Sequence, residues 1–423
     1  MNFDRYEWRG DLFASDLPVL LQKFHTELSL IEREWLDTFT VYFDNYEEVH
    51  ETRRTARLRS YGEIPAEGVT LSYLKKLRWQ LEVKSDKAKN RVIYFEGLPT
   101  KISSGLYAES GDSFTDTQLL PQILRVTRRR HYSYGERIEE SERITVDVQR
   151  LNYFFDTNEH LIFLGDLGPR VEIKSKTQKE LTSLIRKYSL DEIAWVLKHR
   201  SQHLYFQHCL RSVLSKESYE GFPEVELKYS LSSASHKELL KTILDWVSSQ
   251  DDMALLLPRP AYVVRLLKNH IVYDPITGKE YTHVEFPSGK VSIKHKQRPR
   301  VQDELILLRD TQGDLMGEVN NTPSFVKDGA YLNSYIKIQR KIPFALANGH
   351  AYHIAIDYCV DKYKRELEQV EIEFIGSIGE RPESLEAITG DMLQIHSRMM
   401  EIPAFASELH PTTESKFSFF SKK

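Results

Sequence analysis

Charged side chains recur two residues apart in segments of this chain that alternate between polar and apolar residues. Side chains two residues apart on a β-strand point to the same face of a sheet. Arginine forks bind phosphate oxygens, and carboxylates bind Mg²⁺ or Mn²⁺, which in turn bridge to phosphates. The pattern therefore predicts a site for a polyanion together with a divalent cation. The charged sets are Arg57 and Arg59, Glu82 and Lys84, Glu172 and Lys174, Glu224, Glu226 and Lys228, Lys294 and Lys296, and Glu371 and Glu373.

The residues between these charges are apolar and need a core on the opposite face of each strand. Examples are Leu58, Val83 and Ile173 in the first half and Val225 and Ile372 in the second. A single strand of this kind is typical of a solvated sheet face. Many of them together favour a sheet closed into a barrel, with the apolar set outward under helices and the ionic set in the lumen.

The elements that would position these charges fall into two similar cycles. The first cycle begins with a strand at Phe3–Arg9 and a helix at Leu17–Leu36. Period-2 alternation then predicts a run of antiparallel strands. They are Phe39–Asp44, Arg54–Tyr61, Trp79–Ser85, Ile123–Tyr132, Arg143–Arg150 and Arg170–Lys176.

The second cycle repeats this order after a helical connector. It opens with a strand at Glu224–Tyr229 and a helix at Ser233–Ser249, which indicates an internal duplication. A further helix is expected at Pro382–Met400, before a polar tail that should be loose. The predicted domains are 1–176, a connector 177–218, a second domain 219–380, and the terminal helix and tail 381–423. The strands of the second cycle are Asn269–Tyr273, Lys290–Lys296, Glu304–Arg309, Tyr335–Arg340, Tyr352–Cys359 and Gln369–Ile375.

Composition excludes several classes of protein. The formal net charge of −4 gives no overall field for nucleic acid or an anionic membrane, so any anion site must come from a local cluster of basic residues. Two cysteines, Cys209 and Cys359, cannot build a disulfide framework, and a reducing cytoplasm is the expected location. No apolar stretch is long enough for a membrane-spanning helix.

The charged sets resemble the motifs of the CYTH superfamily, the triphosphate tunnel metalloenzymes. Glu224-x-Glu226-x-Lys228 resembles the ExExK signature, and Gln369–Phe374 resembles the terminal acidic strand. The first half is more similar to the VTC-type polyphosphate polymerase branch. There Arg57–Arg59 resembles an RxR strand, Arg125–Tyr132 an RxxRxxY strand and Arg143–Asp147 an RxTxD strand, while 81–84 and 171–174 resemble ExK strands.

The resemblance implies an α+β fold, with two tandem antiparallel eight-stranded β-barrel (tunnel) domains and helices packed outside. Members bind a triphosphate, ATP or polyphosphate in the tunnel with Mg²⁺ or Mn²⁺, and they hydrolyse a phosphoanhydride, cyclise ATP or build polyphosphate. Residues implied to carry the reaction are Glu172, Arg143 and Lys84. Those implied to hold phosphates are Arg57, Arg59, Lys84, Arg125, Arg128, Arg143 and Lys174, and, in the second half, Lys228, Lys294, Lys296, Lys337 and Arg340. Metal ligands would be Glu7, Glu172, Glu224, Glu226, Glu371 and Glu373.

Two details of this set bear on the function. The motif spacing selects Arg128 over Arg130, and Arg129 is expected to face solvent. Arg5 and Arg9 stand where a hydrolase-type opening strand has Glu and Lys, so that strand keeps a single carboxylate, Glu7. This departure favours a polymerase-like or binding role over a two-metal hydrolase. A non-catalytic sensor of polyphosphate, nucleotide or inositol phosphate and a structural duplicated barrel stay open as alternatives, as does the oligomeric state.

Overall fold

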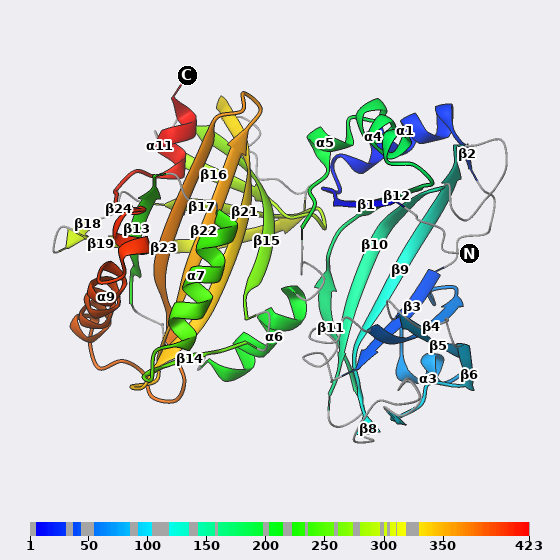
Figure 1. Ribbon diagram of the computed structural model, residues 1–423, viewed down its shortest axis with the longest axis horizontal. Helices are drawn as coiled ribbons and strands as arrows, with labels where there is room; N and C mark the ends of the chain where they lie inside the picture. The colour runs from blue at the N-terminus through cyan, green and yellow to red at the C-terminus, as the bar shows by residue number, and fades with distance from the viewer. Residues whose placement is uncertain are drawn as a thin grey trace. The chain divides into compact units, whose positions relative to one another are not determined.

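The structure, a computed structural model, divides the chain into two compact units, Met1–Leu197 (unit 1) and Lys198–Lys423 (unit 2), each described here by itself (Figure 1). No helix among the described residues is both long and apolar enough to cross a membrane. The residues described are 6–30, 37–43, 55–84, 92–103, 118–134, 143–156, 160–197, 203–214, 222–232, 236–257, 261–273, 280–296, 300–302, 305–309, 311–318 and 330–422.

Unit 1 is built mainly from antiparallel strands. Its strands are β1 (Tyr6–Asp11), β2 (Ser29–Leu30), β3 (Asp37–Phe43), β4 (Thr55–Gly62), β5 (Arg78–Lys84), β6 (Val92–Glu96), β7 (Ile102–Ser103), β8 (Gln118–Leu119), β9 (Pro121–Ser133), β10 (Arg143–Phe155), β11 (Leu161–Asp166) and β12 (Arg170–Ser175). Its helices are α1 (Leu17–Glu27), α3 (Leu71–Leu74), α4 (Gln178–Lys187) and α5 (Leu190–Ile193).

Ten of these strands form one sheet in the order β1-β12-β10-β9-β3-β4-β5-β6, with β11 on β10 and β2 on β9. The prediction of mainly antiparallel strands with outer helices is confirmed. The closed eight-stranded barrel is not, because β1 and β6 are the two ends of the path and no ladder joins them among the described residues. The sequence does not predict strands β2, β6, β7, β8 and β11, and β2 falls within the segment predicted as a helix. The predicted helix at Leu17–Leu36 ends at Glu27, and its last six residues lie outside the described part.

The apolar face of this sheet is buried under the helices. Val171 and Ile173 of β12 pack in one core with Leu181 and Leu184 of α4 and with Leu190 of α5. Residues 177–197, predicted as a connector, are therefore part of unit 1. The reason is that α4 is amphipathic and its apolar side covers β12.

Unit 2 is also mainly antiparallel. Its strands are β13 (Glu224–Leu231), β14 (Met253–Leu255), β15 (Val263–Tyr273), β16 (Glu280–Glu285), β17 (Lys290–Lys296), β18 (Arg300–Gln302), β19 (Ile306–Arg309), β20 (Thr311–Glu318), β21 (Ala330–Leu346), β22 (His350–Asp361), β23 (Glu366–Ser377) and β24 (Leu409–Pro411). Its helices are α6 (His203–Val213), α7 (His236–Ser248), α9 (Leu385–Met400), α10 (Pro403–Ala406) and α11 (Lys416–Ser421).

The unit 2 sheet has twelve strands, again not the predicted eight, in the order β18-β19-β13-β23-β22-β21-β15-β16-β17-β20, with β14 on β21 and β24 on β13. Its last helix, α11, packs against β21 and β15. The expectation of a loose tail is wrong, because Phe420 is fully buried and stacks on Tyr335 with ring centroids 4.4 Å apart. Burying this aromatic ring favours an ordered tail.

A cationic cavity in unit 1

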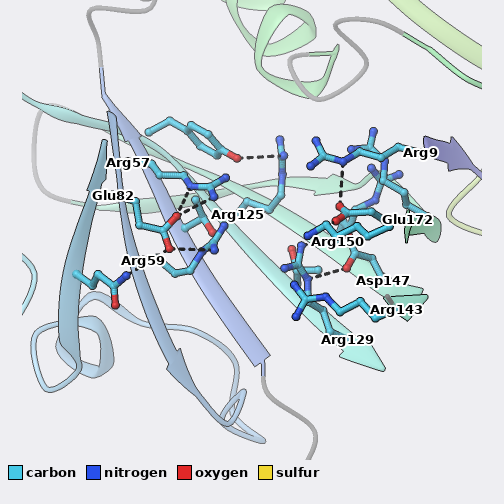
Figure 2. A pocket seen from close by; sticks show the side chains of 16 residues that line it. Arg9, Arg57, Arg59, Glu82, Arg125, Arg129, Arg143, Asp147, Arg150 and Glu172 are labelled. Carbon is cyan, nitrogen blue, oxygen red and sulfur yellow. Dashed lines mark hydrogen bonds and ion pairs between the residues drawn. The ribbon is translucent and has the colours of Figure 1, made fainter. Parts of the chain in front are cut away.

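The polar face of the unit 1 sheet lines a cavity of about 320 Å³ (Figure 2). Nine of the sixteen side chains that line it are cationic and three are carboxylates. The cationic residues are Arg9, Arg57, Arg59, Arg125, Arg129, Arg143, Arg150, Arg170 and Lys174, the carboxylates are Glu82, Asp147 and Glu172, and the remaining four are Thr40, Tyr42, Gln80 and Thr127.

Strand alternation decides which arginines of β9 reach this cavity. Arg125, Thr127 and Arg129 line it, whereas Leu124 and Val126 are buried in the apolar core on the other side. Arg128 lies on the outer face with its side chain 43% exposed, and its Nε is 3.4 Å from Asp37 Oδ1. The expectations that Arg128 reaches the site and that Arg129 faces solvent are therefore both wrong. The spacing of three in the motif cannot place Arg125 and Arg128 on one face of a regular strand.

A bulge in β10 adds an arginine that the sequence did not predict. The pairing of β10 with β9 shifts between Asp147 and Gln149, so Asp147 and Arg150 both face the cavity although they are three residues apart. An extra residue at a bulge changes the face on which the following side chains lie. Regular alternation along 143–150 correctly predicts that Arg143 faces the cavity, but it places Arg150 on the opposite face.

Arg150 and Arg170 anchor the floor of the cavity through a buried carboxylate, Asp11. Arg150 is 1% exposed and its Nη2 donates to Asp11 Oδ1 at 2.5 Å, while Arg170 donates to both Asp11 oxygens at 3.2 and 3.3 Å. Arg150 also donates to the carbonyls of Gly168 and Leu167 at 2.7 and 3.2 Å. Such a multiply bonded guanidinium is held rigidly.

Glu82 links two of the predicted phosphate-binding residues. Arg57 Nη2 lies 2.7 Å from Glu82 Oε2, and Arg59 Nη1 lies 3.0 Å from Oε1. The three side chains come from neighbouring strands, since Arg57 on β4 pairs with Glu82 on β5. Lys84 lies at the end of β5, and its side chain is outside the described part of the structure.

Glu172, the predicted metal ligand, lies at the other side of the cavity between two cations (Figure 2). Arg9 Nε donates to its Oε2 at 2.9 Å, and Lys174 Nζ is 2.6 Å from its Oε1. Burial opposes ionisation of Glu172, but Arg9 and Lys174 outweigh it and lower its pKa to about 2. Glu7 forms an ion pair with the same Arg9 and does not line the cavity.

The excess of cationic over anionic side chains in the cavity affects the pKa values of two nearby residues, Tyr42 and His131. Burial opposes ionisation of Tyr42, but the guanidinium groups of Arg125, Arg57 and Arg59 outweigh it and lower the pKa of the phenol to about 8. Burial, together with Arg143 and Arg129, lowers the pKa of His131 to about 4. Anionic forms are therefore favoured in this cavity and cationic forms are disfavoured.

The carboxylates present do not fit a divalent-cation site. Glu82, Asp147 and Glu172 are each held by at least one arginine; the Asp147 partner is Arg129, whose Nε is 2.7 Å from Oδ1. No group of three or more His, Cys, Asp or Glu side chains suited to a metal occurs in the described ranges. A Mg²⁺ ion requires several oxygens in near-octahedral geometry.

In unit 2 two of the predicted acidic residues, Glu226 and Glu371, also meet, but around lysines. Lys228 Nζ is 3.2 Å from both Glu226 Oε1 and Glu371 Oε1, and β13 pairs with β23 in the register that brings them together. Lys416 from α11 lies 2.7 Å from Glu371 Oε1 and 2.8 Å from Asp357 Oδ2. Burial opposes the charge on Lys416, but Asp357 and Glu371 outweigh it and raise its pKa well above the usual value.

The other predicted residues of unit 2 do not all converge. Lys337 Nζ lies 3.0 Å from Asp357 Oδ2, and Glu373 pairs with His353 at 2.8 Å. Arg340, three residues from Lys337 on β21, lies on the opposite face, as strand alternation requires. Glu224 and Lys294 stand on β13 and β17 and are partly buried, and the Lys296 side chain is outside the description.

Comparison with known proteins gives structural similarities only. No model of a known family and no curated protein matches the sequence. Among solved structures, a candidate adenylyl cyclase from Hippeastrum with a dominant triphosphatase activity is 11% identical over 47% of this chain and 94% of its own, with a TM-score of 0.31. The mimivirus capping enzyme triphosphatase is 9% identical over 48% of this chain and 98% of its own, with a TM-score of 0.29. A protein from Pyrococcus horikoshii OT3 is 11% identical over 46% of this chain and 98% of its own, with a TM-score of 0.28.

Proposed function

We propose that unit 1 binds the phosphate chain of a linear triphosphate or polyphosphate in its cavity and acts on a phosphoanhydride of that chain. One observation carries the proposal: nine cationic side chains and three carboxylates share one polar cavity. Two carboxylates outside the lining each offset one further charge, Asp11 through Arg150 and Arg170 and Glu7 through Arg9. The remaining surplus of positive charge is similar in size to the charge of a linear triphosphate, about −4 near neutrality.

The distribution of the cations favours a chain over a single phosphate. Arg57 and Arg59 stand on β4, near one end of the sheet path, whereas Arg9 stands on β1 at the other end. Figure 2 shows two groups of side chains, one around Glu82 and one around Glu172, with Arg125 between them. A ligand that contacts both groups needs several anionic centres in a row, which tripolyphosphate, ATP and polyphosphate all have.

The same arrangement suits phosphoryl transfer. Catalysis of this reaction consists mainly of holding the chain in line and neutralising the charge that develops on the transferred group. Rigid arginines perform both tasks in a cavity whose dielectric constant is below that of water. Two reaction classes fit this arrangement: hydrolysis of a triphosphate and extension of a polyphosphate from ATP.

A second function, binding without turnover, is favoured by the ion pairing of Glu82, Asp147 and Glu172. Each carboxylate is held by arginine, so it cannot act as a base without giving up that contact. A unit of this kind would sense polyphosphate, a nucleotide or an inositol phosphate.

Calorimetry and a turnover assay on the full chain test these functions together. We expect saturable binding of sodium tripolyphosphate, and weaker binding by Arg59→Gln than by Arg186→Gln, a matched control on the exposed surface of α4. Orthophosphate release from tripolyphosphate or ATP would show hydrolysis, and lengthening of the chain would show polymerisation. Binding without either product would assign the sensor function, and absence of binding would refute the phosphate-chain proposal.

A further inference from the structure

Arg9 occupies the place between two carboxylates where the sequence predicts a metal ion. In the β1–β12 ladder Arg9 is opposite Glu172, and Glu7 is opposite Lys174. Arg9 forms ion pairs with both Glu7 and Glu172. One guanidinium therefore already bridges the two residues that were expected to hold Mg²⁺ or Mn²⁺.

A divalent cation at Glu172 would have to displace existing contacts at both of its oxygens. Arg9 Nε is 2.9 Å from Oε2, and Lys174 Nζ is 2.6 Å from Oε1. Arg129 adds a third positive charge near this carboxylate. A second cation here would meet like charges inside a partly buried cavity, where repulsion is stronger than in water.

The other two carboxylates of the cavity are held in the same way. Glu82 bridges Arg57 and Arg59 through separate oxygens, and Asp147 accepts from Arg129 at 2.7 and 3.4 Å. All three acidic groups thus serve to position cations toward the cavity. This is a different use from the ligation of a metal by carboxylates that are free to coordinate it.

We propose that unit 1 binds its phosphate chain without a divalent cation, with Arg9 and Lys174 supplying the positive charge that a metal would otherwise bring to Glu172. This inference rests on the proposed phosphate-chain function and specifies the ionic form of its ligand. The free polyanion is the form that matches the cavity, because a bound Mg²⁺ removes two of its negative charges. Divalent cations in solution then compete with the protein for the ligand.

Calorimetry of the full chain with sodium tripolyphosphate in EDTA and in excess Mg²⁺ or Mn²⁺ tests the inference. We expect binding in EDTA that is at least as tight as binding with either metal. Binding that requires a metal, or that a metal strengthens by about tenfold, would overturn the inference and leave the phosphate-chain function standing. No binding under any condition would refute the proposed function itself.

The variant Glu172→Gln distinguishes a carboxylate that positions cations from one that binds a metal, because the two roles predict opposite changes in the affinity for tripolyphosphate. It removes a negative charge from the cavity and releases Arg9 and Lys174, so binding in EDTA should tighten by about fivefold, since one charge acts across a few ångströms. A metal ligand at this position would give the opposite result, namely weaker binding in Mg²⁺.

Two companion variants keep the test interpretable. Glu82→Gln should also tighten binding, because Glu82 holds Arg57 and Arg59 in a similar way, and Arg186→Gln should change nothing. Thermal unfolding confirms that each variant is folded. Weaker binding by folded Glu172→Gln in the presence of metal would overturn the inference.

Discussion

The two neighbouring arginines Arg128 and Arg129 give the sharpest test of the cavity. Arg129 lines it with its side chain 26% exposed, and Arg128 projects from the opposite face with 43% exposure. A hydrogen bond from a charged donor contributes about 1.5–3 kcal/mol. Because Arg129 already forms an ion pair with Asp147, we expect a contribution at the lower end of this energy range. That contribution corresponds to about a tenfold loss of affinity for Arg129→Gln. For Arg128→Gln we expect a change below about twofold, since an exposed charge is screened by solvent.

The assay is calorimetric titration of both variants with tripolyphosphate in EDTA, after thermal unfolding has shown that they are folded. Because Arg129→Gln leaves Asp147 without its main partner, the double variant Arg129→Gln/Asp147→Asn restores the net charge. Its affinity should lie between those of the wild type and the single variant. If Arg128→Gln weakens binding as much as Arg129→Gln, the assignment of faces on β9 is wrong and Arg129 is not a cation of the cavity.

Three further results follow from the buried charges. Tripolyphosphate should raise the pKa of Tyr42 from about 8, and a pH titration followed by absorbance near 295 nm should show this shift in the wild type but not in Tyr42→Phe. Because folding lowers this pKa, ionisation of Tyr42 should also increase the free energy of unfolding between about pH 8 and pH 10. Lys416→Met should destabilise unit 2 by about 2–3 kcal/mol, since it leaves Asp357 and Glu371 with one lysine fewer. A Tm of the variant within about 1 °C of the wild-type Tm would contradict this prediction. Arg150→Met should lower the Tm of unit 1, because loss of the ion pair between Arg150 and Asp11 costs about 3 kcal/mol. An unchanged Tm would show that this buried ion pair does not stabilise the unit.

The strand pattern predicted the inner face where the ladder is regular. Arg57 and Arg59 on β4, and Glu172 and Lys174 on β12, lie on the cavity as their spacing of two requires. The prediction fails at Arg128, because a motif spacing of three conflicts with the two-residue period of the strand. It also misses Arg150, whose orientation depends on a bulge that sequence alternation cannot reveal.

The partners of the charges were harder to predict than their positions. The sequence shows that Arg9 departs from the expected opening strand, but its ion pair with Glu172 depends on the register of β1 with β12. Lys416 lies 45 residues from Glu371 in a tail whose composition resembles that of a loose segment. Long-range pairs of this kind are set by tertiary packing, which local periodicity does not encode.

The same kind of charged strand has opposite electrostatic consequences in the two units. In unit 2 the buried carboxylates of Asp357 and Glu371 are matched by lysines from three elements, including the 11% exposed Lys416 of α11. Their mutual compensation accounts for the buried charges without any ligand. In unit 1 the lining keeps more cations than its carboxylates can balance, and like charges held together away from water are costly unless an anion compensates them. The imbalance, rather than the presence of charged strands, is the reason for proposing the anion site in unit 1.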